Sequence, residues 1–162
     1  MKRRRLILSL FAIGCFIATA TLIPNSGTAQ SDKVKSAMAD LKAETGKLGT
    51  PKVQGNDLYF GSTKADNSIV DGVVKKDGGS ASLFVKNGNQ FVRVATTLKK
   101  ADGSSAVGTS MDAKNPALAK LNSGEAFYGD APVLGKTYDT GYEPMKDASG
   151  AVIGAYYVGY PK

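Results

Sequence analysis

The feature that most constrains the fold is the alternation of short β-prone runs with tight-turn sequences over most of the chain. Runs rich in valine, isoleucine, phenylalanine and tyrosine are separated by short stretches of glycine, aspartate, asparagine and serine, such as residues 147–150. Such turns join neighbouring antiparallel strands. The pattern predicts an antiparallel sheet made of hairpins. One predicted strand covers residues 69–74 and turns at residues 76–79 into the next, residues 81–85.

Two helices are predicted beside this sheet. The first begins at Ser31 and carries Val34, Met38 and Leu41 at helical spacing. The simplest interpretation is that this apolar stripe packs on the sheet, and the alternative is that it pairs two copies of the chain as a homodimer. A shorter helix is predicted to begin at Pro116. Hairpin strands with only two clear helices indicate an α+β fold.

Residues 1–29 have the composition of a signal peptide. A basic start at residues 2–5 precedes an uncharged, mainly apolar run at residues 6–23. Small residues then occupy the two positions that a signal peptidase reads, which predicts cleavage before Gln30. We therefore expect an exported, periplasmic protein with a single ligand-binding domain over residues 30–162.

Two other interpretations of the leader remain. Its apolar run is eighteen residues long, which is barely enough to span a bilayer if the leader is left uncut. Cys15 follows Ala12-Ile13-Gly14, a poor lipoprotein cleavage site, and apolar residues come after it. An uncleaved membrane anchor is therefore the main alternative to a cleaved signal peptide.

The charge of the predicted mature domain is ordinary. The chain has 21 Lys and Arg against 14 Asp and Glu, but the leader carries four of the basic residues and none of the acidic ones. The mature domain thus has 17 basic and 14 acidic residues, a net charge of +3, which does not indicate a nucleic-acid partner. The chain has no histidine, and its one cysteine would leave with the leader, which excludes the usual zinc sites and His-dependent triads. We predict no cofactor and no enzymatic activity.

The candidate chemistry lies in the run FVRVATTLKKADGSSAVGT at residues 91–109. It opens as a strand in which residues 91, 93, 95 and 97 are expected on one face, because strand side chains alternate. Val92 and Val94 are expected to pack against a helix on the other face. Arg93 is the one charge inside this apolar run, and burying an unpaired charge is costly. We therefore interpret its face as the floor of a small polar pocket.

Tyrosines are concentrated in the second half of the chain. Tyr138 and Tyr142 share one face of a predicted strand, and Tyr128 lies in the preceding strand. With Arg93, their hydroxyls would suit a small carboxylate or a zwitterion, because a guanidinium can hold a carboxylate through two hydrogen bonds. The alternative is that Arg93 pairs with a structural acid such as Glu143 and that the tyrosines are packing residues.

Six ordered segments carry a resemblance to a known family: FVRVATTL at 91–98, DGSSAVGT at 102–109, GEAFYG at 124–129, YDTGYEPM at 138–145, DASGAVIG at 147–154 and YVGYP at 157–161. They resemble the Cache sensor domain, and are most similar to the Cache 3/Cache 2 type in the extracytoplasmic region of bacterial methyl-accepting chemotaxis proteins. The resemblance is specific over residues 70–161. It implies a PAS-like fold with a long N-terminal helix packed on a central antiparallel sheet and a ligand pocket on the opposite face.

The resemblance also implies binding of a small organic acid or amino acid without catalysis. By position, it places six residues in the pocket: Arg93, Thr97, Thr109, Tyr128, Tyr138 and Tyr142. No signalling segment follows the last predicted strand before Lys162. We therefore expect a sensor domain that acts through a separate partner, such as a membrane receptor or sensor kinase. The alternative is a periplasmic protein-interaction or scaffold module with a vestigial pocket.

Overall fold

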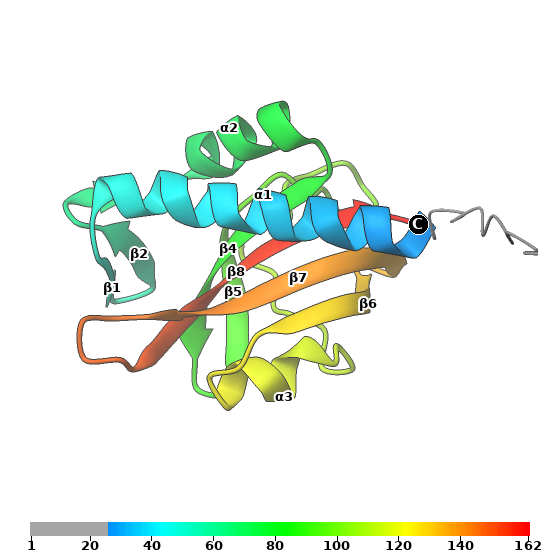
Figure 1. Ribbon diagram of the computed structural model, residues 1–162. Helices are drawn as coiled ribbons and strands as arrows, with labels where there is room; N and C mark the ends of the chain where they lie inside the picture. The colour runs from blue at the N-terminus through cyan, green and yellow to red at the C-terminus, as the bar shows by residue number, and fades with distance from the viewer. Residues whose placement is uncertain (1–25) are drawn as a thin grey trace, which may run out of the picture.

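The computed structural model describes the backbone of residues 26–162 and the side chains from Ser31 onward. In chain order its elements are α1 (Ser26–Leu48), β1 (Pro51–Gln54), β2 (Asp57–Phe60), β3 (Thr63–Lys64), α2 (Asn67–Asp77), β4 (Ser80–Asn87), β5 (Gln90–Thr96), α3 (Ala117–Asn122), β6 (Phe127–Val133), β7 (Lys136–Lys146) and β8 (Val152–Pro161) (Figure 1). Most of the predicted signal peptide, residues 1–29, lies outside the described residues. The predicted cleavage point before Gln30 falls within α1. Between residues 26 and 162, no helix has both the length and the apolar character that crossing a membrane requires.

The described residues form two antiparallel sheets. The larger has five strands in the order β5-β4-β8-β7-β6, and the smaller has three in the order β1-β2-β3. All the pairings are antiparallel, which confirms the predicted α+β class. Strand β8 lies at the centre of the larger sheet, between β4 and β7. The last residues of the chain are therefore integral to the fold.

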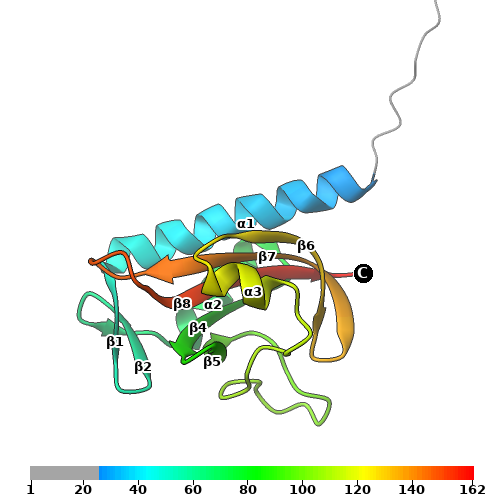
Figure 2. The same ribbon diagram turned by 90° about the horizontal axis from the view of Figure 1, so that it is seen from below.

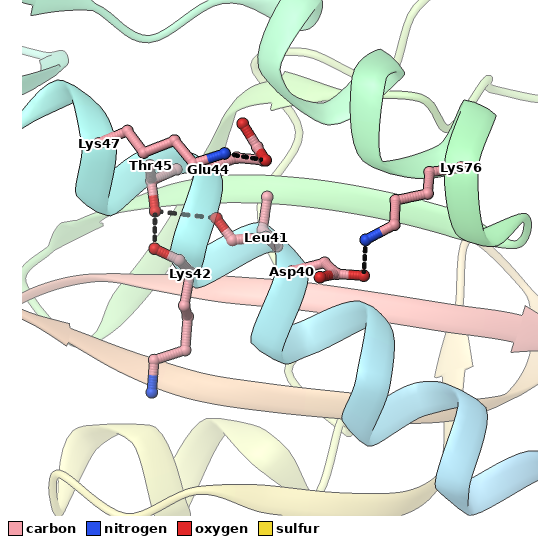
Figure 3. Close-up of polar contacts among 7 residues, drawn as sticks. All are labelled: Asp40, Leu41, Lys42, Glu44, Thr45, Lys47 and Lys76. Atoms are coloured by element: carbon pink, nitrogen blue, oxygen red, sulfur yellow. Dashed lines mark hydrogen bonds and ion pairs between the residues drawn. The ribbon is translucent and has the colours of Figure 1, made fainter.

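One face of the larger sheet lies under α1 and α2, and we call it the helix-covered face (Figure 1). The α1 stripe of Val34, Met38 and Leu41 is buried here, as its spacing predicts. Thr45 continues the stripe, and its hydroxyl donates to the Leu41 carbonyl inside the helix (Figure 3). Because the stripe is covered by its own sheet, it is not free to pair two copies of the chain, and that alternative is wrong for these residues.

Helix α2 replaces the strand predicted at residues 69–74. Asp66 begins it, with its carboxylate accepting the Ser68 backbone N–H at 2.9 Å. Val70 and Val73 are then buried three residues apart, a helical rather than a strand spacing. The predicted hairpin turn at residues 76–79 is instead the helix end, where the Gly78 N–H donates to the Val74 carbonyl at 2.8 Å. The cap and the burial of one helical face outweigh the strand preference of the β-branched residues.

The opposite face of the larger sheet carries Arg93, and we call it the arginine face. It is covered by α3 and by the long connection at residues 97–116, and Figure 2 shows this connection on the side of the sheet away from α1. The connection is tied to the edge strand β5 by the isolated bridge Val92–Ser110, and a second bridge, Lys99–Ser105, lies within the connection itself. The predicted helix after Pro116 is confirmed as α3. Arg93 is thus enclosed between the sheet and residues that follow it in the chain.

Candidate functional site

A β-bulge in β5 decides which side chains accompany Arg93. Arg93 pairs with Phe84 and Ala95 pairs with Leu83, which leaves Val94 as an extra residue. Such a bulge shifts the alternation of side chains by one position. Ala95 therefore belongs to the buried cluster of the helix-covered face. The prediction that residues 91, 93, 95 and 97 share one face is wrong beyond Arg93 for this reason.

The Arg93 side chain is almost completely buried, with 3% of its surface exposed. Its Nη1 donates to the Thr109 hydroxyl at 2.9 Å and to the Ser110 carbonyl at 3.3 Å. The guanidinium carbon lies 4.9 Å from the centre of the Phe84 ring, a cation–π distance. Its Nε has no hydrogen-bond partner among the described residues. The guanidinium of Arg93 therefore uses only part of its hydrogen-bonding capacity.

No acidic side chain within the described residues forms an ion pair with Arg93. The alternative pairing with Glu143 is wrong, because that carboxylate lies against α1 and binds Lys42 and Tyr128. Burial lowers the pKa of Arg93, while the nearby hydroxyls of Tyr142 and Tyr157 act in the opposite direction. An arginine stays charged even so. The arginine face therefore holds a buried cation without a counter-charge from the described residues.

Two buried tyrosines stand beside this cation. The rings of Tyr142 and Tyr157 are 4.9 Å apart between centres. The Asn115 amide donates to the Tyr142 hydroxyl at 2.9 Å, and the hydroxyls of Ser80 and Tyr157 are 3.1 Å apart. Burial raises the pKa of Tyr142 to about 12 and also raises that of Tyr157. Both hydroxyls are neutral at physiological pH. The Ser80 hydroxyl donates to the Gly159 carbonyl at 2.9 Å, so Tyr157 donates to Ser80, whereas Tyr142 accepts from Asn115 and can donate to an anion.

Residues 21–162 match the family model of the Cache 3/Cache 2 fusion domain. The chain belongs to this family. The resemblance carried by the segments from FVRVATTL to YVGYP is thereby confirmed. Cache domains are extracellular sensor modules that bind small molecules. No curated protein matches the sequence significantly.

The Cache domain brings only some of the predicted site residues together. Thr109 contacts Arg93 directly, and Tyr142 lies close enough to influence its pKa. Thr97 lies just beyond the end of β5, where its hydroxyl accepts the Ala81 backbone N–H at 3.1 Å, a structural role. The bulge at Val94 accounts for this displacement of Thr97 from the Arg93 side.

The other two predicted tyrosines lie away from Arg93. Tyr128 is on the helix-covered face, 38% exposed, and donates to Glu143 at 2.6 Å. It lies over Gly141, where an added Cβ would meet both its ring and Val34 of α1. Tyr138 packs at the margin of the arginine face and lines a separate hollow. Strand alternation alone could not place Tyr128, because it does not say which face of β6 meets α1.

The space around Arg93 is filled by side chains of the Cache domain itself. The layer between the sheet and its cover consists of fully or almost fully buried residues: Phe84, Phe91, Leu98, Ala106, Met111, Leu121, Tyr142 and Tyr157. Arg93 thus lies within a packed layer instead of on the floor of an open pocket, which corrects the prediction. Sequence reasoning gave no place in the site to Phe84 or Asn115. The strand registers that bring them there are not visible in a single sequence.

Proposed function

We propose that this Cache domain is an exported, periplasmic sensor module that binds a small carboxylate-bearing metabolite, an organic acid or an amino acid, through Arg93. One observation carries the proposal: Arg93 is buried with no acidic partner among the described residues. A buried charge without a partner is costly, and a ligand carboxylate supplies the missing counter-charge. Arg93 is also the only arginine of the chain after residue 5.

The neighbours of Arg93 suit a carboxylate. The free Nε and the guanidinium fork can hold both carboxylate oxygens. The neutral hydroxyl of Tyr142, which accepts from Asn115, supplies a further donor, and the Phe84 ring supplies an apolar wall. The proposed arrangement is PAS-like, with helices on one face of the sheet and the ligand on the other.

Ligand binding at Arg93 would act directly on the cover of the site. The Arg93 backbone N–H donates to the Thr109 carbonyl at 3.0 Å, and the Gly108 N–H donates to the Arg93 carbonyl at 2.8 Å. The loop that carries Thr109 is therefore attached to the strand at the ligand-binding residue itself. Because packed side chains fill the site, a ligand must displace this loop to enter. We propose that the displaced loop is what a membrane receptor or sensor kinase detects.

A thermal-shift screen of the purified protein against small organic acids and amino acids tests the proposal. A ligand at about 100 times its dissociation constant should add about 2.7 kcal/mol of stability, which is several degrees in Tm. The Arg93→Met variant should lose this response, and Arg93→Lys should keep only part of it because a lysine cannot form the two-point contact. An unchanged response in Arg93→Met would overturn the assignment of the ligand to Arg93.

A second candidate function is a protein-interaction or scaffold module with a vestigial pocket. The packed side chains around Arg93 favour it, because they leave the ligand no ready space. This function predicts no thermal shift with any metabolite. It also predicts association, for example a homodimer through the outward side of α1, detectable by size-exclusion chromatography with light scattering. A strict monomer that responds to a carboxylate would reject it in favour of the sensor.

A further inference from the structure

A separate hollow lies where the residues that follow β5 meet the β6–β7 hairpin. Its volume is about 220 Å³. It is lined by an apolar wall, three lysines and one tyrosine: Leu98, Ala101, Val133, Leu134, Lys99, Lys100, Lys136 and Tyr138. We call it the lysine hollow. Arg93 is not part of its lining.

The charge of the lysine hollow is entirely positive. Its lining contains three cations and no carboxylate. None of the three lysines forms an ion pair within the described residues, whereas Lys42 and Lys76, for example, each pair with an acid of another element. Three like charges around one small volume repel one another, and an anion placed between them relieves that repulsion.

The backbone that carries these lysines is held in a defined geometry. Lys136 pairs with Val133 across a two-residue turn in which Leu134 and Gly135 have positive φ angles of 49° and 82°. On the other side, Lys99 bridges to Ser105, and the Lys100 N–H donates to the Ser104 carbonyl at 2.8 Å. The lysines therefore approach the hollow from two fixed hairpins instead of from a free loop.

Leu134 is an unusual residue for its position in this turn. Asparagine, aspartate or glycine is normally found where a hairpin turn needs a positive φ, and a leucine there is strained. Its side chain is 40% exposed and lines the lysine hollow. With Val133 and Leu98 it supplies the apolar part of the lining. Such a mixed lining is typical of sites for small organic ligands.

We propose that the lysine hollow binds a small polyanion, a ligand with at least two carboxylate or phosphate groups. Two or three charges are needed for one ligand to engage lysines from both hairpins. The small volume favours a compact molecule, with its carbon skeleton on the Leu134 wall and the Tyr138 hydroxyl as a further donor. The site differs from that at Arg93, where one carboxylate meets one guanidinium, and it does not depend on the proposed function.

Isothermal titration of the purified protein at low ionic strength tests this inference, with citrate and pyrophosphate as probes and acetate as the single-charge comparison. Citrate and pyrophosphate distinguish a carboxylate ligand from a phosphate ligand. The triple variant Lys99→Gln, Lys100→Gln, Lys136→Gln removes the charge of the hollow. The matched control is Lys52→Gln, Lys75→Gln, Lys114→Gln, which removes the same charge from three exposed lysines outside it.

We expect at least one of the two polyanions to bind more tightly than acetate. Its affinity should fall by about tenfold or more in the hollow variant and by much less in the control variant, while Arg93→Met leaves it unchanged. Equal weakening in the two lysine variants would show a non-specific charge effect and overturn the proposal. Loss of binding in Arg93→Met alone would place the polyanion at Arg93 and also overturn it. If neither citrate nor pyrophosphate binds, the proposed site is excluded. That result would leave the separate carboxylate proposal at Arg93 unaffected.

Discussion

Both faces of the larger sheet carry a cluster of buried residues, but the two clusters are built from different chemistry. The helix-covered face is dominated by aliphatic side chains of α1, α2, β4 and β8, such as Leu41, Leu83 and Val158. The arginine face combines aromatic rings with Arg93 and hydroxyl groups. Hydrophobic packing alone explains the composition of the helix-covered face. The arginine face contains a buried charged group, which hydrophobic packing does not explain. The difference separates the part of the domain that stabilises the fold from the part that carries the proposed function.

Strand β8 shows this division within two consecutive residues. Tyr156 faces α1 and stacks near Phe60, with ring centres 6.5 Å apart, in the helix-covered cluster. Tyr157 faces the other way, beside Tyr142 and Arg93. One strand at the centre of the sheet thus serves both faces. Substitutions on the two faces should therefore have separable effects on stability and on ligand binding.

The largest effect is expected from Leu41→Ala on the helix-covered face. Leu41 is fully buried between α1 and the sheet, and such truncations cost about 2–5 kcal/mol. Urea unfolding should show this loss, with ligand affinity unchanged in the protein that remains folded. Leu48→Ala is the matched control, because the same substitution at a side chain 37% exposed should cost much less. Similar losses at the two positions would contradict the assigned packing of α1.

A second substitution tests how tightly the two faces are joined. Gly154 of β8 lies so close to β4 that an added Cβ would be 2.1 Å from the Phe84 carbonyl oxygen. Gly154→Ala must push the central strands apart, and we expect a loss of about 1–3 kcal/mol or more. Because Phe84 contacts Arg93, ligand binding should weaken as well. The control is Gly46→Ala, where an added Cβ meets nothing and a helix gains stability.

The sequence predicts the helix-covered face better than the arginine face. The stripe of α1 and the turn at residues 147–150 are local signals, and they predicted the buried face of α1 and the β7–β8 hairpin correctly. The strand and the turn predicted at residues 69–79 are instead α2 and its end. The surroundings of Arg93 depend on the bulge at Val94 and on which strands β8 joins. These are non-local consequences of packing that one sequence does not show. Arg93 itself was identifiable because a charge inside an apolar strand is a local anomaly.

On the arginine face, Tyr142→Phe should have a moderate effect. It removes the hydroxyl that accepts the Asn115 amide hydrogen bond inside the packed layer, and the loss of such a buried bond costs about 1 kcal/mol. Chemical unfolding and ligand titration should show a lower stability together with weaker carboxylate binding. Tyr128→Phe is the matched substitution on the other face, where the hydroxyl is partly exposed, and it should leave ligand binding unchanged. If Tyr128→Phe weakened carboxylate binding, Tyr128 would have to be assigned to the ligand-binding site after all.

Arg93→Met should separate function from stability most clearly. Replacing a buried charge by an apolar side chain of similar length is often neutral or stabilising, while the lost hydrogen bonds to Thr109 and Ser110 act against this. We expect the free energy of unfolding to change by no more than about 1 kcal/mol, while the carboxylate response is lost. A loss as large as that of Leu41→Ala would mean that Arg93 is a structural residue, and the division between the faces would fail.

The smallest effect is expected from Glu143→Gln, at the rim of the helix-covered face. Burial raises the pKa of Glu143, but the hydrogen bonds from Lys42 and Tyr128 and the Lys42 charge outweigh it, so the pKa lies below its usual value of 4.5. A lowered folded-state pKa gives stability that is present above pH 4.5 and is lost as the pH falls through the folded-state pKa. Because Lys42 is half exposed, the gain is less than about 1 kcal/mol.

Urea unfolding of the wild type and Glu143→Gln at neutral pH and at about pH 3 measures this contribution. The variant should be slightly less stable at neutral pH, and the two proteins should converge in acid, when the wild-type carboxylate is protonated. Added salt should also reduce the difference, because the ion pair is partly exposed. Carboxylate binding should stay unchanged, since Glu143 and Arg93 lie on opposite faces. A pH-independent difference would mean that Glu143 acts through packing and not through its charge.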